Sequence, residues 1–319
     1  MAFINIDDVH VLNETGEQVD KVTGLFTKDE GTTEEEKSFA QLNIGASGGG
    51  GGGRNLLDNP WFGSGEVVNQ RGSTSGTISN AYFIDRWKLS GTYSIAASGI
   101  TFTCNAGAGF SQIFPRALTI GETYTFSVMY GDGSIVSCTF APLANRENVY
   151  SFGDGLYLEI DTRAAFPTHR CIIYTPGVSW TREIKAVKLE KGSVSTLAQD
   201  APPDYGEELA KCMRYFIRIN APYYNNGFGI GRATGGTTCL VFIPLPVPLR
   251  SSPSVSYSNA GNLQLIGNGS NYAVTALAYS GRSEAGVNLS VTSSGISTNH
   301  LYFLTKTNQD CYIDLSADL

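Results

Sequence analysis

The stretch YTFSVMYGDGSIVSCTF, residues 124–140, decides the fold class of this 319-residue chain. Two runs rich in β-branched and aromatic residues, 124–130 and 134–140, flank Gly-Asp-Gly, and Asp-Gly between such runs is typical of a tight β-hairpin. We therefore predict two antiparallel strands joined by a turn at 130–134. Calcium binding by Asp132 is the alternative, but this residue stands outside the dense series of oxygen ligands that calcium requires.

Similar runs continue on both sides of this hairpin. Strands are predicted at 82–89, 94–104, 156–160, 170–174 and 184–189, and FGDG (152–155) repeats the Asp-Gly turn signal around Asp154. Short apolar runs separated by turns are typical of antiparallel sandwiches, so we expect a mainly β chain with a jelly-roll-like β-sandwich over residues 55–200.

A helix and a second β-region are expected beyond residue 200. Asp204, after two prolines, precedes Glu207 by three residues, which predicts a capped helix in a connector at 201–219. Residues 220–319 return to β-like patterning with turns at Asn226-Gly227 and Asn268-Gly269, and we expect a C-terminal β-sandwich. In FIPLPVPLR (242–250) proline at every second position removes backbone donors, so this segment is predicted as an edge strand or an extended arm.

The N-terminal part has a different character. Thr33 and Glu36 form a capping box for a helix of about ten residues whose apolar side is Phe39 and Leu42, followed by Ile44. A helix this short is marginal alone, so these three residues are predicted to attach or oligomerise the segment 1–47. The glycine-rich run 48–54 is interpreted as a hinge.

Charge and composition exclude several functional classes. Residues 1–44 hold ten of the 29 acidic and three of the 22 basic residues, so they carry the whole charge of −7 and leave 19 of each sign elsewhere. A body without net charge has no field to attract nucleic acid, and we expect no nucleic-acid partner. No apolar run is long enough to span a membrane and no basic, apolar leader begins the sequence, so we expect synthesis in a cytosol without membrane insertion.

Catalytic and metal-binding patterns are not recognisable in the sequence. The six cysteines lack a C-x-x-C pair and the three histidines lie far apart, so we predict buried free thiols and no metal site. No nucleophile, zinc or phosphate-loop motif is present, and Asp85, Glu159, Asp161 and Glu190 are interpreted as structural carboxylates. We expect neither catalytic residues nor a cofactor.

Several motifs, in one order, resemble segments of phage and prophage short tail fibres and receptor-binding proteins. TTEEEKSFAQLNIGAS (32–47) is similar to the segment that closes their attachment part. NLLDNPWF (55–62), VNQRG (68–72) and YFIDRWKL (82–89) are similar to the opening of their carbohydrate-binding-like β-sandwich, and 186–216 to its close. PVPLRSSPSVSYS (246–258) and the final YIDLSADL resemble their C-terminal β-domain.

This resemblance implies a virion protein made in a bacterial cytoplasm. It implies a homotrimer that is anchored to other virion proteins through residues 1–47 and binds a host cell-surface glycan. Sugar binding uses aromatic faces; the loop-borne pair Tyr223 and Tyr224, with Phe228 and Trp180, are the candidate ligand-binding residues, whereas Trp61 and Trp87 are interpreted as packing residues.

The preferred hypothesis is a phage fibre or receptor-binding protein that binds host glycans without catalysis. A capsid head fibre or decoration protein is the first alternative, because the same motifs also occur in head fibres. A glycan depolymerase is the second alternative; it requires two facing carboxylates, which the sequence alone cannot pair.

Overall fold

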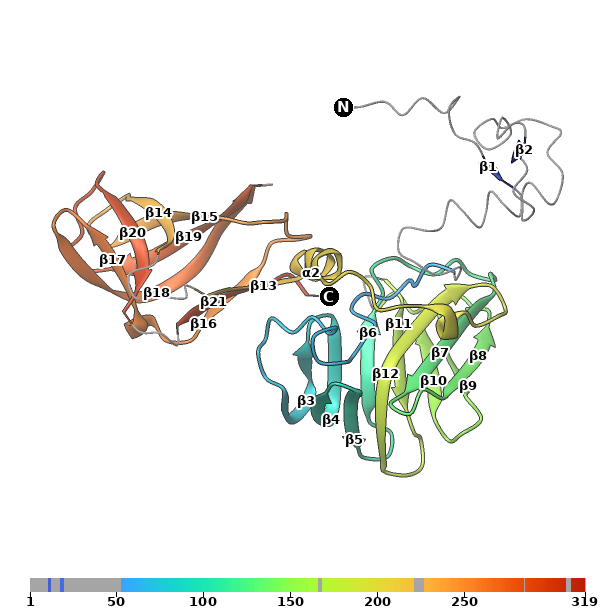
Figure 1. Cartoon of the computed structure of the whole chain (residues 1–319). Coiled ribbons are helices and arrows are strands. Elements are labelled where there is room, and N and C mark those ends of the chain that lie inside the picture. The colour runs from blue at the N-terminus through green and yellow to red at the C-terminus, as the bar shows by residue number, and fades with distance from the viewer. Residues whose placement is uncertain are drawn as a thin grey trace. The chain divides into compact units, whose positions relative to one another are not determined.

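The computed structural model describes residues 53–319 apart from 166–167, 221–226, 284, 308–310 and 319, together with the backbone of two short strands nearer the N-terminus. The chain divides into two compact units, Met1–Gly53 with Gln199–Ala201, and Arg54–Ala198 with Pro202–Leu319. In the first unit, β1 (Val11–Leu12) pairs antiparallel with β2 (Gln18–Val19). The helix predicted from residue 33 lies outside the described residues. The described chain is mainly β, as predicted (Figure 1).

The N-terminal β-domain, residues 54–198, is one antiparallel ten-stranded sheet that surrounds a core. The strands are hydrogen-bonded in the order β8-β7-β12-β5-β4-β6-β11-β10-β9, with β3 also paired to β4. The strand bounds are β3 Ser75–Ile84, β4 Trp87–Ala96, β5 Gly99–Cys104, β6 Gly109–Ile113, β7 Tyr124–Tyr130, β8 Ile135–Phe140, β9 Glu147–Ser151, β10 Tyr157–Asp161, β11 Arg170–Tyr174 and β12 Trp180–Lys191. Phe126 of β7 meets Phe152, before β10, with ring centroids 6.1 Å apart, so distant parts of the sheet face the same core.

The Asp-Gly turns are confirmed, and two strand predictions are wrong. The backbone N–H of Ser134 donates to Asp132 Oδ1 at 2.8 Å, and that of Leu156 donates to Asp154 Oδ1 at 3.0 Å, so both aspartates stabilise hairpin turns. The runs 82–89 and 94–104 are each two strands, separated at residues 85–86 and 97–98. The first turn was missed because Arg86, at φ 70°, adopts the left-handed backbone that glycine usually supplies.

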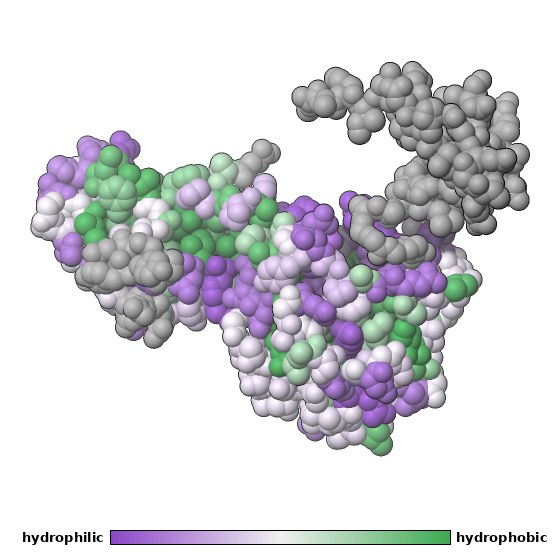
Figure 2. All heavy atoms as spheres, in the orientation of Figure 1, coloured by the Kyte–Doolittle hydropathy of each residue, from purple (hydrophilic) through white to green (hydrophobic). Residues whose placement is uncertain are grey.

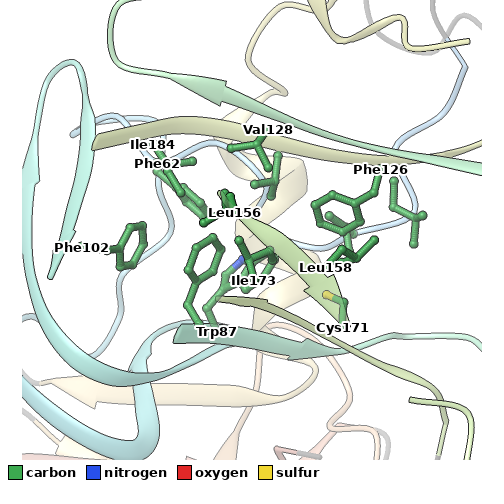
Figure 3. Close-up of a cluster of buried hydrophobic side chains, with 14 of the residues drawn as sticks. Phe62, Trp87, Phe102, Phe126, Val128, Leu156, Leu158, Cys171, Ile173 and Ile184 are labelled. Carbon is green, nitrogen blue, oxygen red and sulfur yellow. The ribbon is translucent and has the colours of Figure 1, made fainter. Parts of the chain in front are cut away.

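Aromatic rings pack together with aliphatic side chains in the centre of this domain (Figure 3). Phe102 and Phe110 stack at 4.5 Å between centroids, and Phe62 meets Trp87 edge-on at 5.5 Å. Such ring pairs stabilise by about 0.5–1.5 kcal/mol beyond the area they bury. The predicted free thiols are also found: all six cysteines are unpaired, and only Cys138 is not fully buried.

Helix α2 and a small sheet follow the N-terminal β-domain. α2 (Tyr205–Met213) begins as predicted, because Asp204 Oδ1 accepts the backbone N–H of Glu207 at 3.0 Å. The short helix η2 (Leu197–Gln199) precedes it. The sheet that follows is three-stranded, in the order β13-β21-β16 (β13 Phe216–Asn220, β16 Ser254–Tyr257, β21 Tyr312–Ser316).

The rest of the C-terminal region is a closed barrel rather than the expected sandwich. The barrel order is β14-β15-β19-β18-β17-β20 (β14 Gly227–Ala233, β15 Thr238–Pro244, β17 Leu263–Gly267, β18 Ser270–Ser283, β19 Gly286–Ser293, β20 Leu301–Lys306), and η3 (Ala260–Asn262) precedes β17. The fourteen-residue β18 carries two register shifts against β19, and bulges of this kind bend a strand so that a sheet can close. The predicted Asn268-Gly269 turn joins β17 to β18, with positive φ at both residues.

The proline-rich segment, 242–250, is neither an edge strand nor an arm over its whole length, because its first three residues belong to β15 and the others form a loop. β15 ends at Pro244, and residues 245–253 belong to no strand. Leu245, Val247 and Leu249 nevertheless pack against the barrel core, so the alternate apolar residues cover the barrel while the prolines end its sheet.

Candidate functional site

A pocket of about 370 Å³ lies where the start of the N-terminal β-domain meets the β6–β7 loop and the end of α2. This volume is within the range of about 300–1,000 Å³ that is usual for small-molecule sites. The pocket is lined by Arg54, Asn55, Leu56, Leu57, Asp58, Phe114, Pro115, Arg116, Ala117, Leu118, Thr119, Tyr124, Lys191, Lys211, Arg214 and Tyr215.

The loop wall of the pocket, residues 114–119, is fixed by hydrogen bonds at both ends. The backbone N–H of Phe114 donates to the carbonyl of His169 at 2.8 Å, and that of Leu118 donates to His169 Nδ1 at 3.0 Å. Burial lowers the pKa of His169, which favours the neutral imidazole whose Nδ1 can accept. At the other end, the N–H of Thr119 donates to the Tyr124 hydroxyl at 3.0 Å.

The opposite wall is equally constrained. Leu56 N–H donates to the carbonyl of Leu189 at 2.8 Å, which holds the entering chain against β12. The backbone N–H of Asp58 donates to Gln112 Oε1 at 3.0 Å, and Gln112 Nε2 donates to the backbone carbonyl of Asp58 at 2.8 Å. A site with fixed walls loses little conformational freedom when a ligand binds.

The pocket is basic. Five of its side chains are cationic, whereas its single carboxylate, Asp58, is paired with Arg86 at 3.0 Å. Lys191 pairs with Glu122 at 2.8 Å and Lys211 with Glu208 at 2.9 Å. The other three cations have no carboxylate partner among the described residues: Arg54, Arg116 and Arg214.

Both tyrosine rings of the pocket already have partners. Tyr124 stacks on Phe140 with centroids 6.0 Å apart. The Tyr215 ring has the guanidinium of Arg86 at 3.6 Å and that of Arg250 at 5.5 Å. Neither tyrosine presents an open face for a sugar ring, so the pocket is chemically a site for charge.

Trp180 and Phe228, two of the aromatic residues predicted to bind ligand, do not line this pocket. Trp180 is 5% exposed, and its indole N–H donates to the carbonyl of Ala108 at 3.0 Å; Phe228 is 5% exposed in the barrel core. Both are packing residues rather than surface platforms, because their strands turn these side chains inward. The predicted pair Tyr223 and Tyr224 lies outside the described residues, as do Phe39, Leu42 and Ile44.

Residues from several of the sequence motifs quoted above meet in a buried polar cluster instead. Asn59, at φ 52°, donates from Nδ2 to the carbonyls of Val68 and Asp85, both at 2.8 Å. Its own backbone N–H donates to Glu208, and its carbonyl accepts the indole N–H of Trp87 at 2.8 Å. Through these hydrogen bonds Asn59 connects its own motif, 55–62, with the motifs 68–72, 82–89 and 186–216.

The same cluster continues toward the C-terminal strands. Gln70 Nε2 donates to the carbonyl of Phe216 at 2.8 Å, and Arg71 pairs with Asp318 at 2.5 Å. Arg218 makes two hydrogen bonds to Asp314, at 2.8 and 2.7 Å. These residues thus have structural roles.

One acidic group among the described residues has the spacing of a metal site. Ligand atoms of Glu147, Glu159 and Asp161 lie within 4.8 Å of one another. Arg163 and Arg170 both pair with Asp161, at 2.8 and 3.3 Å, and each also pairs with one of the two glutamates. The arginines already neutralise these carboxylates, so the cluster is an ion-pair network.

A row of apolar side chains crosses the outside of the barrel. Phe303 of β20 is in register with Ile266 of β17 and Ile230 of β14, and Ile230 is in register with Phe242 of β15. Phe303 is 53% and Ile230 43% exposed, and exposed Leu301 and Leu240 lie in the adjacent register. Figure 2 shows hydrophobic surface over the part of the barrel that Figure 1 labels β14 and β20. We call these six residues the apolar row.

The described helix α2 is too short and too polar to be a membrane span, and no other described helix has the required length. No protein-family model matches the sequence, and a search of curated proteins finds no significant match.

Sequence reasoning missed the pocket arginines. Arg54, Arg116 and Arg214 come from three segments far apart in the chain and belong to no local charge run. Only the folded arrangement brings them to one pocket.

Proposed function

We propose that this chain is a non-enzymatic fibre or receptor-binding protein of a phage particle. Residues 1–47 attach it to other virion proteins, and its β-domains bind a glycan on the host cell surface. The ordered series of motifs that resemble phage fibre proteins supports the phage context. The mainly β architecture of the described residues is compatible with that role.

The observation that carries the binding role is the preformed pocket at the start of the N-terminal β-domain. Its walls are fixed by hydrogen bonds, and its volume suits a small group. Cleavage of a glycosidic bond requires two carboxyl groups, one as an acid and one as a base or nucleophile. The lining holds only Asp58, which is already paired with Arg86, and this favours binding over catalysis.

The apolar row supports self-association of the chain, which a homotrimer requires. Soluble monomers rarely leave a large continuous apolar patch exposed, and such patches usually mark contact surfaces. The row joins four neighbouring strands on one side of the barrel, so a second copy could cover it without disturbing the core.

A glycan array of bacterial surface polysaccharides, probed with the full chain, tests the binding role. We expect saturable binding to a subset of glycans and no release of reducing sugar during long incubation. The variant Tyr223→Ala with Tyr224→Ala measures the part played by the predicted aromatic loop. Release of reducing sugar would support a depolymerase, absence of any glycan binding would contradict the proposal, and antibody labelling of the capsid would identify a head fibre.

A further inference from the structure

We propose that the basic pocket binds the carboxylate or phosphate group of an acidic sugar, with Arg54, Arg116 and Arg214 as the recognising side chains. This inference rests on the proposed function, since it names the chemical class of the glycan. It differs from the aromatic recognition predicted from sequence, because charge rather than ring stacking provides the selectivity.

The charge arrangement is the first reason. The two pocket lysines are neutralised by Glu122 and Glu208, and Asp58 is neutralised by Arg86. The three arginines therefore supply the excess positive charge of the pocket. A guanidinium presents parallel N–H donors that match the two oxygens of a carboxylate or phosphate, and these charge-assisted hydrogen bonds are the strong ones.

The apolar part of the lining is the second reason. Leu57, Phe114 and Leu118 are buried apolar residues that line the same pocket as the exposed arginines. An apolar lining lowers the local dielectric constant, which strengthens the attraction between a guanidinium and an anion. It also offers a dry surface to the carbon skeleton of a sugar.

The size and rigidity of the site restrict the ligand. A volume of about 370 Å³ lies near the lower limit for small-molecule pockets, so one sugar unit with its acidic group is a suitable occupant and a folded partner is not. The β6–β7 loop is held by His169 and Tyr124, so the arginine on it, Arg116, is presented from a fixed backbone.

Calorimetric titration of the full chain tests the proposal with four probes: galacturonic acid, galactose 6-phosphate, galactose and inorganic phosphate. We expect at least one acidic sugar to bind saturably, galactose not to bind, and inorganic phosphate to bind more weakly than the sugar phosphate. Binding should weaken at high salt, because the arginines are exposed and screened.

Arg116→Gln and Arg214→Gln should each weaken acidic-sugar binding about tenfold or more, since a hydrogen bond to a charged group is lost. The matched control is Arg146→Gln, an exposed arginine outside the pocket, which should bind as the unmodified chain does. Thermal melting of every variant establishes that it is folded. Four results would overturn the proposal. Galactose could bind as well as the acidic sugars, or free phosphate more tightly than the sugar phosphate. Neither acidic sugar could bind, or the pocket and control variants could bind with equal affinity.

The glycan array separates this proposal from the proposed function. Suppose that acidic sugars bind and the pocket variants weaken this binding, but that no bacterial glycan on the array binds. This result would support acidic-sugar binding by the pocket and contradict the proposed role as a receptor-binding protein. The opposite result is also possible: the double variant Arg116→Gln with Arg214→Gln binds the array as the unmodified chain does, and no acidic sugar binds in solution. This result would contradict acidic-sugar binding by the pocket, and glycan binding would then belong to another surface.

Discussion

The N-terminal β-domain and the C-terminal barrel are both antiparallel, yet they are packed by different means. The core of the N-terminal β-domain is rich in aromatic side chains, such as the stacked pair Phe102 and Phe110. The barrel core is largely aliphatic, and its strands approach closely at glycine: a Cβ on Gly231 would overlap the carbonyl oxygen of Leu240. Large side chains give one domain its volume, and small ones allow the other to close.

The surfaces of the two domains also differ, in where their charged and apolar residues lie. The N-terminal β-domain contributes most of the basic pocket, and its exposed apolar residues, such as Val178 and Val194, lie on separate turns. The barrel gathers its exposed apolar residues into the apolar row. The comparison suggests a division of labour in which one domain binds ligand and the other contacts further copies of the chain.

The largest effect is expected from Arg86→Ala, which removes a buried cation from the N-terminal β-domain. Arg86 is buried, donates to Asp58 at 3.0 Å and to the carbonyl of Ile113 at 2.7 Å, and lies over Tyr215. Loss of one partner leaves a buried charge uncompensated and costs about 3–5 kcal/mol. Urea unfolding followed by tryptophan fluorescence measures it, because all three tryptophans belong to this domain.

The matched control for this experiment is Arg146→Ala, at an exposed loop position, which should change the unfolding free energy by no more than about 0.5 kcal/mol. Similar unfolding midpoints for the two variants would show that the contacts of Arg86 contribute little to stability.

The next largest effect tests the apolar row. Phe303→Ser with Ile230→Ser should weaken self-association, because fully burying one such side chain contributes about 1.5–3 kcal/mol. Mass photometry over a range of protein concentrations measures the fraction of trimer. Val194→Ser, which removes an exposed apolar residue of the other domain, should leave the distribution unchanged. If the Phe303→Ser, Ile230→Ser variant assembles as the unmodified chain does, the apolar row is not part of the contact between copies.

A smaller effect is expected from Gly231→Ala in the barrel. The added methyl group has to displace the backbone of β15, and overpacking of this kind costs about 1–3 kcal/mol. Hydrogen exchange of the β14 and β15 amides should become faster. Gly235→Ala provides the control, since its Cβ would meet no heavy atom within 4 Å. Equal protection in both variants would mean that glycine is not required for barrel closure.

Features that depend on neighbouring residues could be predicted from the sequence. The Asp132 and Asp154 turns and the Asp204 cap each need only a side-chain oxygen two or three residues from a backbone N–H, so their short-range pattern was sufficient. The buried thiols were likewise predictable from their wide spacing.

Features that depend on distant contacts could not be predicted. The turn at Arg86 has no glycine or proline signal, because its left-handed backbone is stabilised by Asp58 and Tyr215, which are remote in sequence. Barrel closure depends on bulges in β18 that alternation of apolar residues does not reveal. The pocket arginines show no common pattern for the same reason, since Arg54 and Arg214 are 160 positions apart.

The last effect is a gradual dependence of stability on pH, and it arises in the N-terminal β-domain. Asp85 is fully buried; its Oδ2 accepts the N–H of Gln70 at 2.6 Å, and its Oδ1 has no hydrogen-bond partner among the described residues. Burial raises its pKa to about 7, although Arg71 and Arg218 oppose the shift and Asp318 adds to it. In the unfolded chain the same carboxyl titrates near its ordinary pKa of about 3.9.

Between about pH 4 and about pH 7 the folded protein therefore holds a proton that the unfolded chain has lost, and the stability that Asp85 contributes falls as pH rises, by at most about 1.4 kcal/mol per pH unit. Asp85→Asn keeps an oxygen for Gln70 and cannot ionise, so the stability difference between variant and unmodified chain should grow in favour of the variant up to neutral pH. Urea midpoints measured by tryptophan fluorescence give this difference, in which titrations common to both proteins cancel. For the control Asp132→Asn the difference should stay constant over the same pH range, because the hydrogen bonds from Ser134 lower the pKa of that exposed carboxyl and it is ionised in both the folded and the unfolded chain. A difference for Asp85→Asn that stays constant with pH would mean that this carboxylate remains ionised in the fold.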